Sequence, residues 1–179
     1  MVRSWLALVA VGVVVAGSCC ATPIRYEGAR KGKIVDASTG EPIEGAVVLA
    51  VWYTVIPTPA GGSSQYHDAQ EAVSDSNGDF TIPGIGVQVT GGLNMYTQFV
   101  AFKAGYQYLR ASWDSASEGP DLAKGANWEG DRAVVPIKKL TMEQRKKRVV
   151  DSPFVPDNKQ PFLIREINKE RSELGLRPL

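Results

Sequence analysis

The feature that most limits the fold of this chain is the segment Ile43–Ile56, which reads IEGAVVLAVWYTVI. β-Branched and aromatic side chains dominate it, and no charged residue follows Glu44 within it. Such side chains fit a pleated sheet better than a helix, because β-branching restricts χ1. A run of this length predicts a strand that is buried in part on both faces. The chain is therefore expected to be mainly β.

Shorter strand-like segments accompany this run, separated by sequences typical of turns. They are Lys33–Asp36, Glu71–Ser74, Gly78–Pro83, Gln98–Lys103, Tyr106–Trp113 and Ala133–Leu140. The dipeptide Asn77-Gly78 predicts a type I′ hairpin, since both central residues of that turn need a positive φ. Pro136 implies an edge position or a bulge in the last strand. The stretches 57–70, 84–94 and 115–131 are expected to be loops.

After Leu140 the pattern changes from strand to helix. Thr141 and Gln144 form a capping box at the start of MEQRKKRVV. A second helix is expected with Pro161 at its first position and Gly175 just past its end. Its apolar stripe at helical spacing consists of Leu163, Ile164, Ile167 and Leu174.

The tail is expected to pack back onto the strands. A free helix of about 14 residues is marginal in water, so its apolar stripe needs a partner surface. Residues 19–137 hold 8 basic and 13 acidic side chains, net −5, and residues 138–179 hold 11 and 6, net +5. These opposite charges favour docking, with Ile167 buried against strands and Arg145 to Arg148 left at the surface. The total of +1 excludes bulk polyanion binding, and we expect no nucleic-acid partner.

The N-terminus has the layout of an export signal. Arg3 precedes Trp5–Gly17, an uncharged and mostly apolar run of thirteen residues, which is short for a membrane span. The sequence Ala16-Gly17-Ser18-Cys19 resembles a bacterial lipobox, with Ala16 where leucine is usual. We expect Cys19 to be lipidated, although Cys20 offers a second frame. Ordinary signal-peptidase cleavage with secretion, and a retained anchor, are the alternatives.

The remaining cysteine and histidine content leaves little for metal or nucleophile chemistry. No cysteine occurs in residues 21–179, so the folded part contains no disulfide although an exported compartment would allow one. A bridge between the adjacent Cys19 and Cys20 would strain disulfide geometry. His67 is the single histidine. We expect neither a metal nor another cofactor.

Three segments together resemble the carboxypeptidase regulatory-like domain family, which has a transthyretin-like β-sandwich. They are Gly32–Val48, with GKIVDASTGEPIEGAVV; Val73–Pro83, with VSDSNGDFTIP; and Phe99–Tyr106, with FVAFKAGY. The resemblance covers roughly residues 30–140 and not the helical tail. It implies an antiparallel Ig- or transthyretin-like sandwich of about seven strands, used for attachment or interaction. No peptidase domain accompanies it.

This resemblance and the N-terminal pattern divide the chain into four parts. Residues 1–18 are expected to be a lipoprotein-type signal peptide, 19–29 a linker, 30–140 the β-sandwich and 141–179 a helical tail. The alternation of apolar residues predicts the sandwich core. Its expected members are Ile34, Val48, Ala50, Trp52, Phe80, Ile82, Phe99, Ala101 and Val135.

Two sets of residues are candidates for binding. Tyr66, Tyr96 and Trp128 fall in expected loops, where aromatic faces could stack on sugars, although aromatic residues on strands are mostly core. Arg145, Lys146, Lys147 and Arg148 form a basic run that fits either an anionic membrane surface or a solvated helix face.

Two catalytic or metal interpretations carry less weight. Asp75, Asn77 and Asp79 alternate as calcium ligands do, but Gly78 and Gly86 break the EF-hand pattern, so a plain turn is expected. Ser63, Ser64, His67 and Asp68 lie close in sequence without the frame of a nucleophile elbow.

The sequence therefore predicts a non-catalytic lipoprotein of the bacterial cell envelope. Its sandwich would act as an interaction or structural module that contacts an envelope protein or a glycan, while a lipid anchor at Cys19 would hold it to a membrane. A secreted module that binds glycan or peptidoglycan is the first alternative. An uncharacterised hydrolase is the second.

Overall fold

The computed structural model describes residues 24–112, 127–129, 132–148, 150 and 152–179. The expected signal peptide, Cys19 and most of the expected loop at 115–131 lie outside these residues. The described strands are β1 (Ile24–Glu27), β2 (Arg30–Asp36), β3 (Val47–Thr58), β4 (Gly61–Val73), β5 (Asp79–Ile82), β6 (Gly86–Val89), β7 (Asn94–Phe102), β8 (Leu109–Ser112), β9 (Asn127–Glu129) and β10 (Arg132–Ile137). The described helices are α2 (Met142–Lys147), the short 3₁₀ helix η1 (Asp157–Lys159) and α3 (Pro161–Glu173).

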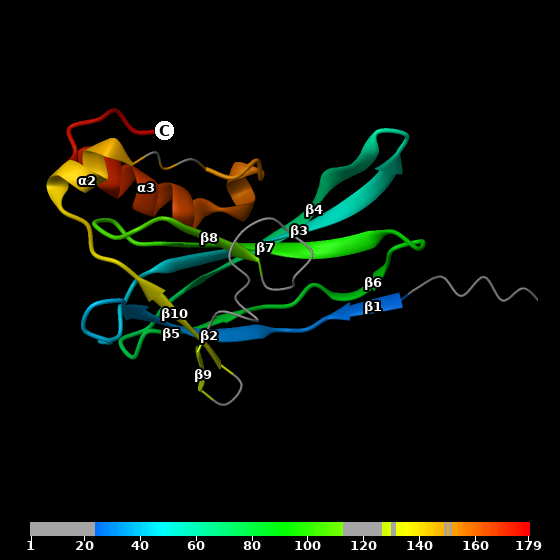
Figure 1. The fold of residues 1–179 in the computed structure, drawn as a ribbon, viewed down its shortest axis with the longest axis horizontal. Coiled ribbons are helices and arrows are strands. Elements are labelled where there is room, and N and C mark those ends of the chain that lie inside the picture. Colours follow the sequence, from blue (N-terminus) through cyan, green and yellow to red (C-terminus); the bar gives the residue numbers. More distant parts are fainter. Residues whose placement is uncertain (1–23, 113–126, 130–131, 149, 151) are drawn as a thin grey trace, which may run out of the picture.

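The fold is a β-sandwich with a C-terminal helical tail (Figure 1). One sheet has the strand order β5-β2-β10-β9 and the other the order β4-β3-β7-β8, while β1 and β6 form a separate ribbon of two strands. The predicted mainly β class is confirmed. All described pairings are antiparallel except that of β2 with β10, which runs parallel. The described part alone contains more strands than the expected seven or so.

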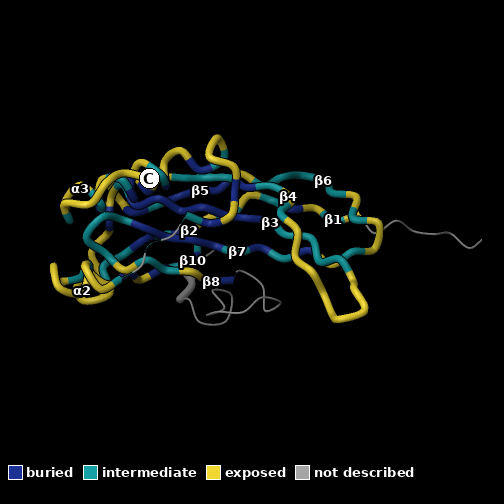
Figure 2. Tube along the Cα trace, turned by 90° about the horizontal axis from the view of Figure 1, so that it is seen from above, coloured by how far each residue is buried: buried dark blue, intermediate teal, exposed yellow. Residues whose placement is uncertain are grey.

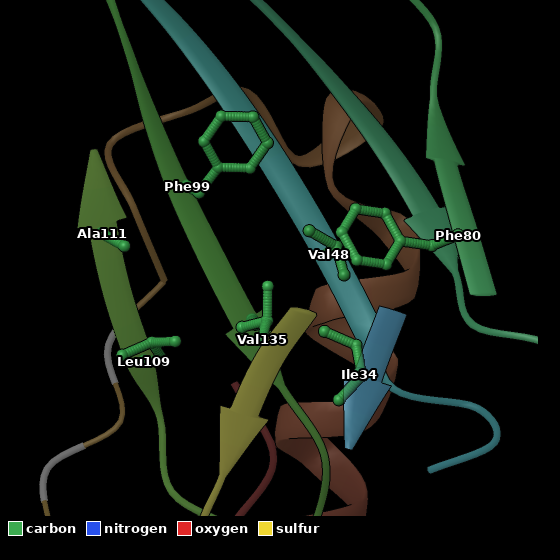
Figure 3. A pocket seen from close by; sticks show the side chains of 8 residues that line it. Ile34, Val48, Phe80, Phe99, Leu109, Ala111 and Val135 are labelled. Atoms are coloured by element: carbon green, nitrogen blue, oxygen red, sulfur yellow. The ribbon is translucent and has the colours of Figure 1, made fainter. Parts of the chain in front are cut away.

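The core between the two sheets contains all nine residues predicted for it. Each is at most 4% exposed. A void of about 10 Å³ lies among eight apolar side chains, including Val48, Phe80 and Phe99 (Figure 3). A void of this size would hold at most one water molecule, and its apolar lining offers that water no hydrogen-bond partner, so it is a packing defect and not a ligand site.

The central strand β3 is buried on both faces, as the long apolar run predicts. Its six residues Val47–Trp52 are all buried. Alternate residues belong to two separate clusters, because side chains along a strand point to opposite faces. Val48, Ala50 and Trp52 face the second sheet, whereas Val47, Leu49 and Val51 face away from it.

The helical tail covers this second face of the β4-β3-β7-β8 sheet and so adds a third layer (Figure 1). Leu163 and Ile167 of α3 are fully buried there with Val155 of the preceding connector, against strand residues of β3 and β7. The expected docking of the tail, with Ile167 buried, is confirmed. The expected capping box is present at Thr141, and Pro161 starts α3. Gly175 lies just past the C-cap residue Leu174 of α3 and has a positive φ of 72°.

The expected loop at 57–70 is wrong. Except at its tip, this segment is strand, and β3 and β4 form a long hairpin whose outer end is exposed (Figure 2). The Pro, Gly and Ser residues that indicated a loop are placed at the tip and along an arm with little apolar burial. Backbone pairing with β3 holds this arm, so the apolar alternation that reveals a half-buried strand is absent from it. Short strands β6 and β9 also lie within expected loops.

The expected Asn77-Gly78 hairpin is also wrong. The strands on either side, β4 and β5, belong to different sheets, so the turn connects the two layers of the sandwich. Only Gly78 has a positive φ, at 76°, and the Gly78 N–H donates to the Asp75 carbonyl at 2.9 Å. The Asp75 carboxylate accepts from the Asn77 and Asp79 N–H groups at 2.8 and 3.0 Å. This side-chain bonding stabilises a turn other than type I′.

Pro136 occupies the edge-like position that its sequence implies. Strand β10 lies between β2 and β9, and among the described residues β9 pairs with Arg132–Val134. Pro136 therefore lies beyond the end of β9 and opposite Val35 of β2. Its missing N–H therefore removes no donor from the described ladder with β9.

Candidate binding groove

A surface groove of about 510 Å³ lies between strand β4 and the connector that leads into α3. We call it the connector groove. Its lining consists of Tyr66, Ser152, Pro153, Phe154, Val155, Pro156, Asp157 and Gln160. The Phe154 side chain is 99% exposed beside it. The groove has the size of a small-molecule or peptide site and is mostly apolar.

The buried amide of Gln160 gives the connector its shape. Its Nε2 donates to the Val155 carbonyl at 2.7 Å, and its Oε1 accepts from the Ser152 hydroxyl at 2.9 Å. Pro153 and Pro156 restrict the backbone on either side of Phe154 and Val155. Val155 points into the core while Phe154 points to water. The groove wall is thus held by a satisfied polar group and two prolines.

Two carboxylates of β4 attach the connector and α3 to the sheet. The Lys159 ammonium lies 2.7 Å from the Asp68 carboxylate, and this hydrogen bond raises the pKa of Lys159. The Glu71 carboxylate accepts from the Phe162 and Leu163 N–H groups at 2.9 and 2.7 Å, at the N-terminus of α3. Burial raises the pKa of Glu71, although these two bonds act in the opposite direction. Glu71 takes the capping role that the helix's own Gln160 does not fill.

A row of three tyrosines on adjacent strands continues from the groove. Tyr53 of β3 pairs in register with Tyr66 of β4 and with Tyr96 of β7. The Tyr53 and Tyr96 rings stack with centroids 5.2 Å apart, and the Tyr96 hydroxyl donates to the Ser64 hydroxyl at 3.0 Å. Burial raises the pKa values of Tyr53 and Tyr66. We call these residues the tyrosine row.

The predicted aromatic residues therefore have separate places. Tyr66 lines the groove, and Tyr96 lies in the row two strands away. The backbone of Trp128 is in β9 of the other sheet, and its side chain lies outside the described residues. All three are on strands and not in loops.

The basic run is not the exposed patch that its sequence predicts. Arg145 and Arg148 are 10% and 11% exposed, and both pair with the buried Glu170 of α3. Arg145 and Arg148 are three residues apart, so they lie on the same side of this short helical turn, and that side faces α3. Lys146 and Lys147 are therefore exposed while the two arginines are not.

Glu170 is the centre of this ion cluster. Its carboxylate accepts from the Gly105 N–H at 2.8 Å as well as from both arginines. Burial alone would raise the pKa of Glu170, but these hydrogen bonds and the arginine charges hold it below its ordinary value of 4.5. The guanidinium of Arg148 also lies over the Phe102 ring at 5.2 Å. Glu170 and Arg148 thus join the tail to the sheet, whereas Arg145 pairs with Glu170 and Glu173 within the tail.

The residues considered for catalysis or for metal binding each contact a different partner and do not meet in one site. Nε2 of the exposed His67 lies 2.9 Å from Oε1 of Gln88, and Asp68 pairs with Lys159. One guanidinium nitrogen of Arg132, Nη1, donates to both carboxylate oxygens of Asp79, at 2.9 and 2.8 Å. Across the parts of the chain that the structure describes, no three His, Cys, Asp or Glu side chains meet as a metal site would require.

Phe154 and its flanking prolines are the functional candidates that the sequence did not reveal. The segment SPFVPD contains two apolar residues in a polar connector, which is the available signal. Their separation into one buried and one exposed residue depends on how the tail docks. Sequence periodicity does not report that arrangement.

No family model matches this chain, and no curated protein matches it. Among the described residues, no helix is long and apolar enough to cross a membrane.

Proposed function

We propose that this chain is a non-catalytic, lipid-anchored protein of the bacterial cell envelope, whose sandwich binds another protein through the connector groove. The observation that carries the binding role is the Phe154 ring, almost fully exposed beside a mostly apolar groove. Exposed aromatic side chains next to a groove are typical of recognition sites, because covering them on binding is favourable. The lipid anchor rests on the Ala16-Gly17-Ser18-Cys19 sequence.

The sequence resemblance to carboxypeptidase regulatory-like domains supports the same role. That family implies a module for attachment or interaction, and the sandwich fold is compatible with it. The described lining of the groove combines apolar walls with two hydroxyls, a carboxylate and an amide. This is the composition of a binding surface, in which a few polar groups orient a mostly apolar ligand.

Photocrosslinking tests the groove. The full chain is produced with benzoylphenylalanine in place of Phe154, and in a control in place of Phe162, which is exposed on α3 outside the groove. We expect a discrete protein adduct from position 154 only, and its loss when Tyr66→Ala is added. Equal adducts from both positions, or an adduct indifferent to Tyr66→Ala, would contradict the proposal.

Intact-mass analysis of the membrane fraction tests the anchor. We expect loss of residues 1–18 and acyl mass on Cys19, both abolished by Cys19→Ser. A soluble, unmodified chain would contradict this part of the proposal.

Glycan binding is the second candidate, and the tyrosine row favours it. Aromatic faces side by side on one sheet can stack on the apolar faces of sugars, and Tyr66 joins the row to the groove. Affinity electrophoresis in gels containing soluble peptidoglycan fragments distinguishes it. Retardation that Tyr66→Ala removes, and that Tyr26→Ala on β1 leaves intact, would support a glycan ligand over a protein one.

A further inference from the structure

The ribbon formed by β1 and β6 has its apolar side chains outside and its polar side chains inside. Ile24 pairs with Val89 and Tyr26 with Val87, so these four side chains share one face. They are between 64% and 73% exposed. We call this the ribbon face. A strand pair on a soluble domain normally has the reverse pattern, with its apolar face on the core.

The polar face of the ribbon is fixed to the sandwich. The Glu27 carboxylate is buried, accepts from the Trp52 indole N–H at 3.2 Å, and pairs with Arg30 at 2.8 Å. The Arg25 guanidinium donates to the Met95 carbonyl at 2.7 Å and also pairs with Glu27. Because this buried network sets the orientation of β1, the exposure of Ile24 and Tyr26 is built into the fold.

The ribbon lies at the end of the molecule where a lipid anchor would attach. β1 and β6 lie at one end of the longest axis, and α2 and α3 lie toward the other (Figure 1 and Figure 2). Ile24 follows Cys19 by five residues. Five residues span at most about 18 Å even when fully extended. An acylated Cys19 would therefore hold the ribbon close to the headgroup region of its bilayer.

We propose that the ribbon face lies on the surface of the membrane that holds Cys19. This inference depends on the lipid anchor of the proposed function. The tyrosine suits this place, since amphipathic rings concentrate at the interface between lipid and water. The ribbon face presents no charged side chain of its own, because Arg25 and Glu27 are on the opposite face. This contact would orient the sandwich with the helical tail directed away from the bilayer.

Depth-dependent quenching tests the orientation. The full lipidated chain carries Cys20→Ser and one added cysteine labelled with an environment-sensitive nitrobenzoxadiazole probe. The added cysteine is Val87→Cys, with Val89→Cys as a second reporter and Lys146→Cys on exposed α2 as the control. Each protein is reconstituted in vesicles of phosphatidylethanolamine and phosphatidylglycerol, with or without a phospholipid that carries a nitroxide near its headgroup.

We expect the nitroxide lipid to quench the probe at positions 87 and 89 about twofold or more, because interfacial apolar faces bury about 5–10 Å into the headgroup boundary. Position 146 should keep its emission. A blue-shifted probe at 87 without nitroxide quenching would indicate a protein contact, such as a second copy, and would overturn the proposal. An unshifted, unquenched probe would overturn it as well.

A mass measurement on the same samples separates the two proposals. If Cys19 carries acyl chains and position 87 is not quenched, only the ribbon contact fails. If Cys19 carries no acyl mass, the anchor itself fails and the ribbon contact fails with it.

Discussion

Replacing Ile167 by alanine tests whether the tail is part of the folded core. Ile167 is fully buried between α3 and the outer face of the β4-β3-β7-β8 sheet. The substitution removes three carbon groups, and at roughly 0.8 kcal/mol each the lost transfer free energy is about 2.4 kcal/mol. The remaining cavity adds to this, so the free energy of unfolding should fall by about 2–5 kcal/mol.

Ile164→Ala is the matched control, since it makes the same change on the same helix at a half-buried position. Urea denaturation gives the global effect, and hydrogen exchange of peptides from residues 161–173 gives the local one. A loss of about 2.4 kcal/mol should increase exchange in α3 roughly 50-fold. If Ile167→Ala and Ile164→Ala differ by less than about 0.5 kcal/mol, within ordinary surface effects, the tail contributes no core and the three-layer description is refuted.

Three further predictions concern the sandwich and the ion cluster. Phe80→Ala should cost about 3–5 kcal/mol in urea melts, since Phe80 is 4% exposed; a loss below about 1 kcal/mol would mean that its ring is not in the core. Glu170→Gln leaves Arg145 and Arg148 without their shared carboxylate and should cost about 3–5 kcal/mol at pH 7. The pKa of Glu170 is below 4.5 in the folded state, so its ionised carboxylate contributes to the free energy of unfolding above pH 4.5, and this contribution is lost as the pH falls further. The wild type should therefore lose more stability than Glu170→Gln between pH 6 and about pH 3. Parallel pH curves for the two proteins would contradict this. Gly78→Ala places a Cβ against the Ile34 carbonyl oxygen at a φ of 76° and should lower the thermal midpoint. Gly40→Ala is the control, because Gly40 also has a positive φ but has open space around it, and its midpoint should fall less. Equal midpoints for the two variants would show that the turn at Gly78 can relax.

Where local pattern and burial coincide, the sequence predicts the fold well. β3 and the nine core residues follow from alternation and from the length of one apolar run. The capping box at Thr141 and the proline at the start of α3 follow from local helix chemistry. These features depend on residues close together in the chain, which is the information that single-sequence patterns contain.

Features set by distant partners are not predictable in this way. Glu71 caps a helix that begins 90 residues later, and Glu170 binds arginines whose sequence indicated a surface patch. The arm of β4 has no apolar alternation because little of it is buried, so its composition indicates a loop. The connector groove arises from the docking of the tail, and only Tyr66 among its lining residues is indicated by the sequence.

The third layer has a consequence for the order in which the protein becomes folded. Leu49 and Ile167 belong to the same cluster but lie 118 positions apart, and the covering helix follows all of the described strands in the chain. Until α3 docks, the sheet residues of this cluster lack the cover that the helix gives them; they are Val47, Leu49, Val51, Val100 and Phe102. A chain in which α3 has not yet docked therefore presents an apolar strip along a paired sheet, the kind of surface through which partly folded proteins associate with one another or with chaperones. Docking of α3 on this strip removes the hazard.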